Sequence, residues 1–164
     1  MSPFFRAGPM RVYLVQHGEA VPADENPDRP LSDKGRTDVQ RVASFLARSV
    51  RVGRIIHSPK MRARDTAVLL AQALGPGGVV EEAASGLAPN DSVEVAADLI
   101  AGWPEDTMMV GHLPFMDRLA SPLVAGSEEA NVAAFQPGTV VCLERADDGG
   151  WALAWMVRPE LLGG

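Results

Sequence analysis

Short apolar runs alternate with amphipathic segments along most of this chain. The first run, residues 11–15, is rich in β-branched and aromatic residues and is typical of a buried strand. Apolar residues between the runs recur at helical spacing, as at Val39, Val42 and Leu46. We predict four strands of this kind, at residues 11–15, 52–57, 79–80 and 107–110. The alternation predicts βαβ units and therefore an α/β fold with a mainly parallel central sheet.

Capping and stop signals bound the predicted helices. We predict a helix capped by Ser32 that ends near Ser49, one opened by Ser58-Pro59 that stops at the Gly/Pro run 75–78, one capped by Asp91 or Ser92 that ends near Gly102, and one with Pro114 in its first turn that ends near Ala125. Each helix lies between two predicted strands or directly follows one. Helices in such positions connect the strands of βαβ units.

The last third of the chain has a different pattern. Two further apolar runs, residues 139–145 and 151–157, are separated by Asp147-Asp-Gly-Gly150, and predict a β-hairpin because these residues accept the positive φ angles of tight turns. We interpret residues 1–9 as a flexible leader, with Met10 as an alternative start, and residues 10–164 as a single domain.

The composition narrows the classes of function. The chain has 164 residues, 46% of them hydrophobic, which suits one domain with a real core. A net charge of −6, from 15 basic and 21 acidic side chains, is not typical of a nucleic-acid or anionic-membrane binder. No apolar stretch approaches the ~20 residues that span a bilayer. Cys142 has no second cysteine to pair with, so we expect a cytoplasmic protein.

Polar clusters follow three of the predicted strands. They are Gln16-His17-Gly18-Glu19, His57-Ser58-Pro59 with Arg62, and Gly111-His112. Ligands of open α/β sheets bind at this edge. A neutral imidazole is a competent nucleophile towards phosphorus, and a second imidazole with a guanidinium can hold the phosphoryl oxygens. The clusters therefore predict phosphoryl transfer without a metal. A zinc hydrolase is the competing interpretation, but no His-Glu-x-x-His helix is present.

Four motifs occur in a fixed order, and together they resemble one family. They are His17-Gly-Glu-Ala20, Arg29-Pro-Leu-Ser-x-x-Gly35, Ser58-Pro-x-x-Arg-Ala-x-x-Thr66 and Gly111-His-Leu-Pro114. The order resembles the histidine phosphatase superfamily, which is phosphoglycerate mutase-like, and within it the short SixA-type phosphohistidine phosphatases. The resemblance covers about residues 10–157. It implies a three-layer α/β/α sandwich and a hydrolase that needs no cofactor.

The resemblance also implies roles for individual residues. His17 resembles the nucleophile that becomes transiently phosphorylated, Arg62 the arginine that binds the phosphoryl oxygens, and His112 the second histidine of the pocket. We expect Gln16, Gly18 and Arg29 to bind phosphate with them, although Arg29 is equally explained as a residue that tethers its proline-rich loop. Glu19 is a candidate proton shuttle, and the dipole of the following helix explains a carboxylate there equally well.

Two departures from the family pattern affect the expected chemistry. Gln16 stands where the family has arginine, so weaker phosphate binding is expected, since a neutral donor contributes about 0.5–1.5 kcal/mol and a charged one roughly 1.5–3. Arg29, Lys60 or Arg64 could supply the missing charge, but Lys60 and Arg64 are equally explained as solvated residues of a helix face. The family's acidic position aligns with Gly86. Glu81, Glu82 and Asp91 are candidate acids, and ordinary surface or capping carboxylates are the competing interpretation of all three.

Without a strong general acid, an alkoxide leaving group departs slowly, whereas the labile P–N bond of phosphohistidine needs less help. The substrate is therefore expected to be a phosphoramidate rather than an ester. We therefore predict a phosphohistidine phosphatase whose partner is a histidine-phosphorylated protein of the phosphotransfer or phosphocarrier type. Two alternatives remain. One is a small-molecule phosphomonoesterase of the same superfamily, and the other is a weakly active module that binds a phosphoprotein because Gln16 replaces the arginine. His57 has no assigned role, and Met108, Met109, Trp151 and Trp155 are expected in the core.

Overall fold

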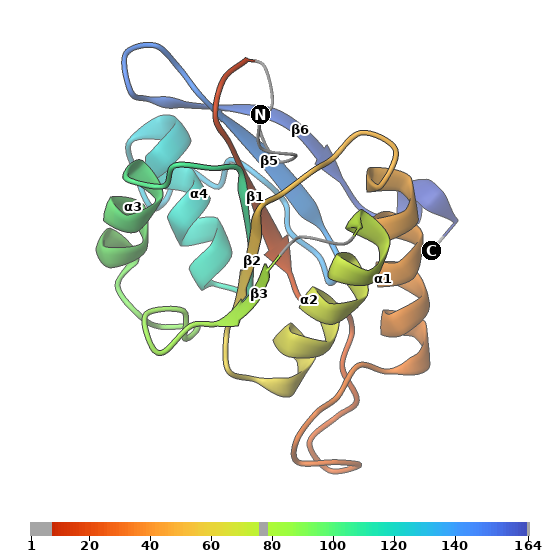
Figure 1. Ribbon diagram of the computed structural model, residues 1–164. Helices are drawn as coiled ribbons and strands as arrows, with labels where there is room; N and C mark the ends of the chain where they lie inside the picture. Colours follow the sequence, from red (N-terminus) through yellow and green to blue (C-terminus); the bar gives the residue numbers. More distant parts are fainter. Residues whose placement is uncertain (1–7, 76–78, 164) are drawn as a thin grey trace.

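The structure is a computed structural model that describes residues 8–75 and 79–163. Residues 1–7 of the predicted leader and residues 76–78 of the predicted helix stop lie outside the described part of the chain. Within that part, helices cover both faces of one central sheet (Figure 1). The predicted α/β/α sandwich is confirmed.

The sheet has six strands in the described residues, in the order β3-β2-β4-β1-β5-β6. Strand β4 lies between β1 and β2 and is parallel to both, and β3 is parallel to β2. The C-terminal hairpin of β5 and β6 is antiparallel and extends the sheet from β1. The strands are β1 (Arg11–Gln16), β2 (Arg54–His57), β3 (Val79–Glu82), β4 (Thr107–Gly111), β5 (Val140–Arg145) and β6 (Trp151–Val157).

Two helices cover each face of the sheet (Figure 1). Alternate side chains of β1 point to opposite faces, so Tyr13 and Val15 pack with one helix pair while Val12 and Leu14 pack with the other. The first pair is α1 (Asp33–Leu46) and α2 (Met61–Leu74), and the second is α3 (Val93–Ala101) and α4 (Phe115–Ala125). A short 3₁₀ helix, η1 (Pro159–Leu162), contacts α1.

The helix boundaries follow the capping chemistry, with small corrections. The Ser32 hydroxyl accepts the Gly35 amide at 3.0 Å, as expected of a cap. Helix α1 ends at Leu46 rather than near Ser49, because the amides of Ser49 and Val50 both donate to the Leu46 carbonyl in a closing turn. Ser92, and not Asp91, caps α3. Helix α2 begins at Met61, one residue after its N-cap Lys60.

Further corrections concern α4, the strands and the aromatic residues. Pro114 is the N-cap of α4 rather than a residue of its first turn. Strand β2 begins at Arg54, two residues later than predicted, and β3 extends to Glu82 as an exposed edge strand. Met108, Met109 and Trp151 are buried as expected. Trp155 lies on the outer strand β6 and is only partly buried, with its ring 5.8 Å from that of Tyr13.

Strand register brings the polar clusters to one edge of the sheet. Gln16 at the end of β1 is level with Gly111 at the end of β4, and His57 at the end of β2 is level with Val110. Because these strands are parallel, the residues that follow them meet at the carboxyl edge. None of the described helices is long and apolar enough to cross a membrane.

Candidate active site

Two imidazoles face each other at this edge. The rings of His17 and His112 have centroids 5.0 Å apart and planes inclined by 59°. The turn after β1 is fixed by the backbone, because the His17 amide donates to the Gly111 carbonyl at 3.0 Å. The two histidines that the sequence analysis singled out therefore lie close enough to act on one group.

The hydrogen bonds of His17 fix its tautomer. Its Nδ1 lies 2.7 Å from the carbonyl oxygen of Gly18. A carbonyl can only accept, so Nδ1 carries the proton and Nε2 holds a free lone pair. The pKa of His17 is lowered from 6.5 to about 4, mainly by burial, which the Gly18 carbonyl opposes and the positive charges of Arg62 and Arg29 reinforce. The ring is therefore neutral at pH 7, which is the form a nucleophile requires.

His112 is also held neutral. It is 2% exposed, and its Nε2 lies 2.6 Å from the Ser58 hydroxyl. Burial lowers the pKa of His112 to about 3. Protonated His17 and the cations Arg62, Lys60 and Arg29 act in the same direction. Its Nδ1 is buried without a hydrogen-bond partner. If the Ser58 hydroxyl donates to Nε2, this Nδ1 carries a proton and is a free donor for an oxyanion.

Two arginines bring positive charge to the imidazoles. Arg62, in the first turn of α2, is partly buried, and its Nε is buried with no partner. Burial and the charge of Arg29 lower the pKa of Arg62, and the guanidinium stays charged. The Arg29 Nε donates to the Val21 carbonyl at 3.0 Å. Arg29 therefore tethers its loop and also acts electrostatically on the site, so both interpretations of this residue fit.

Gly18 and Thr66 connect the segment after β1 that carries His17, called the histidine loop below, to helices α1 and α2. The Gly18 amide donates to the Thr66 hydroxyl at 3.0 Å, and that hydroxyl donates to the Arg62 carbonyl at 2.8 Å. A Cβ on Gly18 would lie 2.7 Å from Cγ2 of Val39. The glycine thus permits close packing on α1, while its N–H is already bonded within the protein.

Gln16 and Glu19 flank His17 and differ in their surroundings. Gln16 is 8% exposed, and its Oε1 is buried without a partner. Glu19 is exposed, and both its carboxylate and its carbonyl oxygen accept from Ser32 at the start of α1. These bonds favour the helix-start interpretation of Glu19 over the proton shuttle.

Two of the three candidate acids have partners of their own. Glu81 lies 3.9 Å from Arg54, and the Asp91 carboxylate accepts the Ala88 amide at 2.9 Å. Glu82 is an exposed residue at the end of β3. Gly86 has a φ of +91°. The bonds of Glu81 and Asp91 are those of surface and turn residues.

The other polar residues of this edge are structural in their contacts. The His57 Nδ1 donates to the Ser58 carbonyl at 2.8 Å, and the ring is buried. Ser58 and Thr66 are the residues that sequence reasoning missed, although both lie within the quoted motifs. Their roles depend on contacts with His112 and Gly18, which are far away in sequence. Across residues 8–75 and 79–163, no group of three or more His, Cys, Asp or Glu side chains could hold a metal ion.

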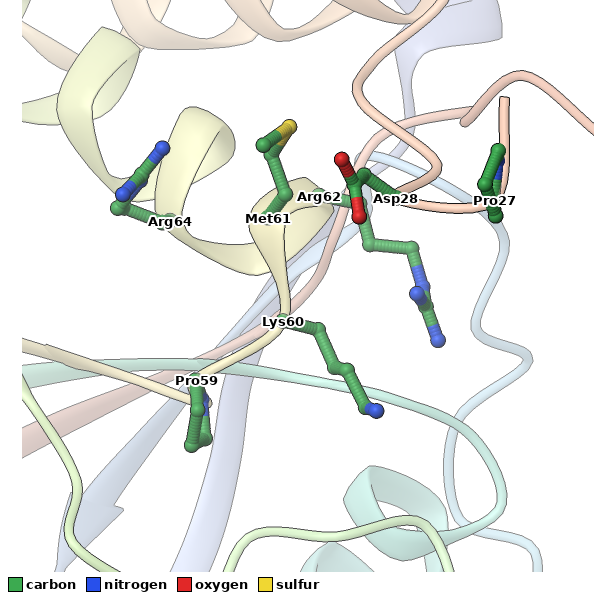
Figure 2. Close-up of a pocket in the computed structure, with 7 residues that line it drawn as sticks. All are labelled: Pro27, Asp28, Pro59, Lys60, Met61, Arg62 and Arg64. Carbon is green, nitrogen blue, oxygen red and sulfur yellow. The ribbon is translucent and has the colours of Figure 1, made fainter. Parts of the chain in front are cut away.

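A cavity of about 320 Å³ opens at the N-terminus of α2. It is lined by Pro27, Asp28, Pro59, Lys60, Met61, Arg62 and Arg64. Figure 2 shows Lys60 and Arg62 extending to the same side of the helix start, whereas Arg64 points away from both. Arg62 belongs both to this cavity and to the surroundings of the imidazoles, so the two spaces adjoin.

The chain resembles known proteins in sequence. Residues 12–85 match the sequence model of the histidine phosphatase superfamily (branch 1). An uncharacterised protein of Picosynechococcus sp. is 36% identical over 126 residues, which cover 71% of this chain and 74% of that protein. The chain spans only 32% of three mycobacterial relatives that it matches at 31% identity.

Solved structures share the fold. The histidine phosphatase SixA complexed with tungstate superposes with a TM-score of 0.82 at 23% identity, over 93% of this chain and 99% of that one. A SixA-type phosphatase from Agrobacterium tumefaciens has a TM-score of 0.74 at 25% identity, over 93% and 100% of the two chains.

Proposed function

This chain belongs to the histidine phosphatase superfamily, and from that premise we propose that it removes the phosphoryl group from phosphohistidine on another protein. The observation that carries the proposal is the pair of neutral imidazoles, 5.0 Å apart, beside Arg62. The free lone pair on Nε2 makes His17 the nucleophile.

The reaction has two displacements at phosphorus. Nε2 of His17 attacks in line, the bond between phosphorus and the substrate imidazole breaks, and phosphorylated His17 forms. Water then attacks this phosphorus, and phosphate and neutral His17 are released. Arg62, Arg29 and His112 bind the phosphoryl oxygens as their charge shifts in each transition state. Atoms balance as phosphohistidine plus water giving histidine plus phosphate.

The leaving group explains the preference for phosphohistidine. When the second ring nitrogen of the substrate is protonated, the departing group is a neutral imidazole and needs no proton from the enzyme. An alkoxide needs an acid. The charged groups that act on the pKa of His17 are the cations Arg62 and Arg29, and no carboxylate is among them. Glu81 lies near Arg54, and Asp91 accepts a hydrogen bond from the Ala88 amide. A phosphoramidate is thus the substrate class that this site suits, and its carrier is a phosphotransfer or phosphocarrier protein.

A small-molecule phosphomonoesterase is the second candidate, because the cavity of about 320 Å³ is large enough for a compact ligand. Phosphate release from a histidine-phosphorylated phosphotransfer protein and from a simple phosphomonoester separates the two. We expect release from the phosphoprotein and much slower release from the ester. His17→Ala should abolish release, by a factor of at least about 10³.

Each outcome decides between named functions. Faster release from the ester would favour the small-molecule enzyme. Release from neither substrate, with inorganic phosphate still bound, would favour a module that only binds phosphoproteins. Release that survives His17→Ala would overturn the nucleophile.

A further inference from the structure

Three cations border the cavity at the start of α2 without ion-pair partners. Lys60, Arg62 and Arg64 form no salt bridge with any residue in the described part of the chain, although the protein carries 21 acidic side chains. Asp28 lines the same cavity but is not paired with any of them. Like charges that lie close together repel one another, and a bound anion relieves that repulsion.

The side chains of these three cations point in different directions. Figure 2 shows the Lys60 ammonium and the Arg62 guanidinium pointing to the same side of the helix start. The Arg64 side chain leaves on the opposite side of α2 (Figure 2). From the sequence, both Lys60 and Arg64 are possible sources of charge, and this geometry favours Lys60.

The backbone at Lys60 is close to the imidazole of His112. Its amide donates to the Ser58 hydroxyl at 3.3 Å, and the same hydroxyl lies 2.6 Å from Nε2 of His112. The positive charge of Lys60 contributes to the lowered pKa of His112. One hydroxyl group therefore separates the start of this lysine from the second imidazole of the pocket.

A phosphoryl group bound in this pocket needs positive charge around it, and Lys60 can supply part of that charge. A phosphoryl group carries about two negative charges near pH 7. Gln16, which precedes the nucleophile, is neutral, and its Oε1 is buried without a partner. Arg62 and Arg29 supply two positive charges, and Arg29 already donates from Nε to its own loop. A flexible ammonium with three donors can give the oxyanion a charge-assisted hydrogen bond. The neutral amide of Gln16 cannot supply such a bond.

We propose that Lys60 is a third phosphoryl-binding cation of this site, whose ammonium donates to an oxygen of the same phosphoryl group that Arg62 holds. The inference deepens the proposed function and rests on it for the position of the phosphoryl group beside His17. It assigns Arg64 no part in binding, since that side chain points away.

Phosphate binding tests the proposal without any turnover. Inorganic phosphate is titrated into the parent protein, Lys60→Gln, Lys60→Arg and Arg64→Gln by calorimetry. Lys60 and Arg64 are both exposed, so the variants should fold, and the two glutamine variants change the net charge equally. We expect Lys60→Gln to bind phosphate about tenfold more weakly, Arg64→Gln to match the parent, and Lys60→Arg to retain most of the affinity.

A second readout follows the His112 imidazole by NMR as the pH changes. Removal of a nearby positive charge raises a histidine pKa, so the midpoint of His112 should rise in Lys60→Gln and not in Arg64→Gln. Equal losses of phosphate affinity in the two glutamine variants, or none in Lys60→Gln, would overturn the proposal. A specific loss in Lys60→Gln in a protein that hydrolyses no phosphohistidine would leave this inference standing and refute the proposed function.

Discussion

At the scale of single residues, the site depends on imidazoles that stay neutral. His17 has its proton on Nδ1, fixed by the Gly18 carbonyl, and its Nε2 is free. Burial and two nearby arginines disfavour a second proton. The residue types of the pocket were readable from the sequence because they lie in motifs. The tautomer and the partner of His112 were not, because the Ser58 hydroxyl comes from 54 residues away.

The lowered pKa of His17 gives a prediction at the scale of single residues. An ordinary histidine titrates near 6.5, whereas burial lowers the pKa of His17 to about 4. Protonation occurs only as the pH falls through the lowered value, so the ring should remain neutral and nucleophilic from pH 8 down to about 5. NMR of the ring protons measures the midpoint, with circular dichroism as the control for folding at low pH. A midpoint between 6 and 7 would show that the ring is not buried as described.

At the scale of elements, helix and strand boundaries could be predicted from the sequence where local residues, such as caps, set them. Ser32 begins α1 as expected, because a hydroxyl that accepts the Gly35 amide is a local interaction. The pairing of β5 with β1 was not predicted, since hydrogen bonds between strands some 130 residues apart leave no local pattern. The exposed extension of β3 to Glu82 was missed for a related reason, because its pairing with β2 and not burial defines it.

The packing of Gly18 on α1 gives a prediction for this scale. A Cβ at Gly18 would lie 2.7 Å from Cγ2 of Val39 and 3.1 Å from the Gly35 carbonyl oxygen. Gly18→Ala should lower the free energy of unfolding by about 1–3 kcal/mol, since the helix or the histidine loop must shift. Urea denaturation measures this change.

Gly102→Ala is the matched control. Its φ is −99°, and the nearest atom to an added Cβ is 3.8 Å away, so the substitution should be neutral or slightly stabilising. Equal effects of the two substitutions would mean that the contact with Val39 does not constrain the loop.

At the scale of the whole molecule, parallel strand order gathers the chemistry. Strands β1, β2 and β4 are neighbours, so the segments that follow them meet although they are up to about 95 residues apart. The α/β alternation of the sequence was sufficient to predict this edge as the site. It was not sufficient to choose between Lys60 and Arg64, because their directions from α2 depend on how that helix packs on the sheet (Figure 2).

The central claim is that His17 carries the phosphoryl group during turnover, and trapping that intermediate tests it most directly. The protein is mixed with a histidine-phosphorylated phosphotransfer protein labelled in the phosphoryl group, and the reaction is quenched in base within milliseconds. We predict one label per chain, stable in base, lost in acid and located at His17 by mass spectrometry. Absence of a label from an active protein, or a label that persists in His17→Ala, would contradict the account.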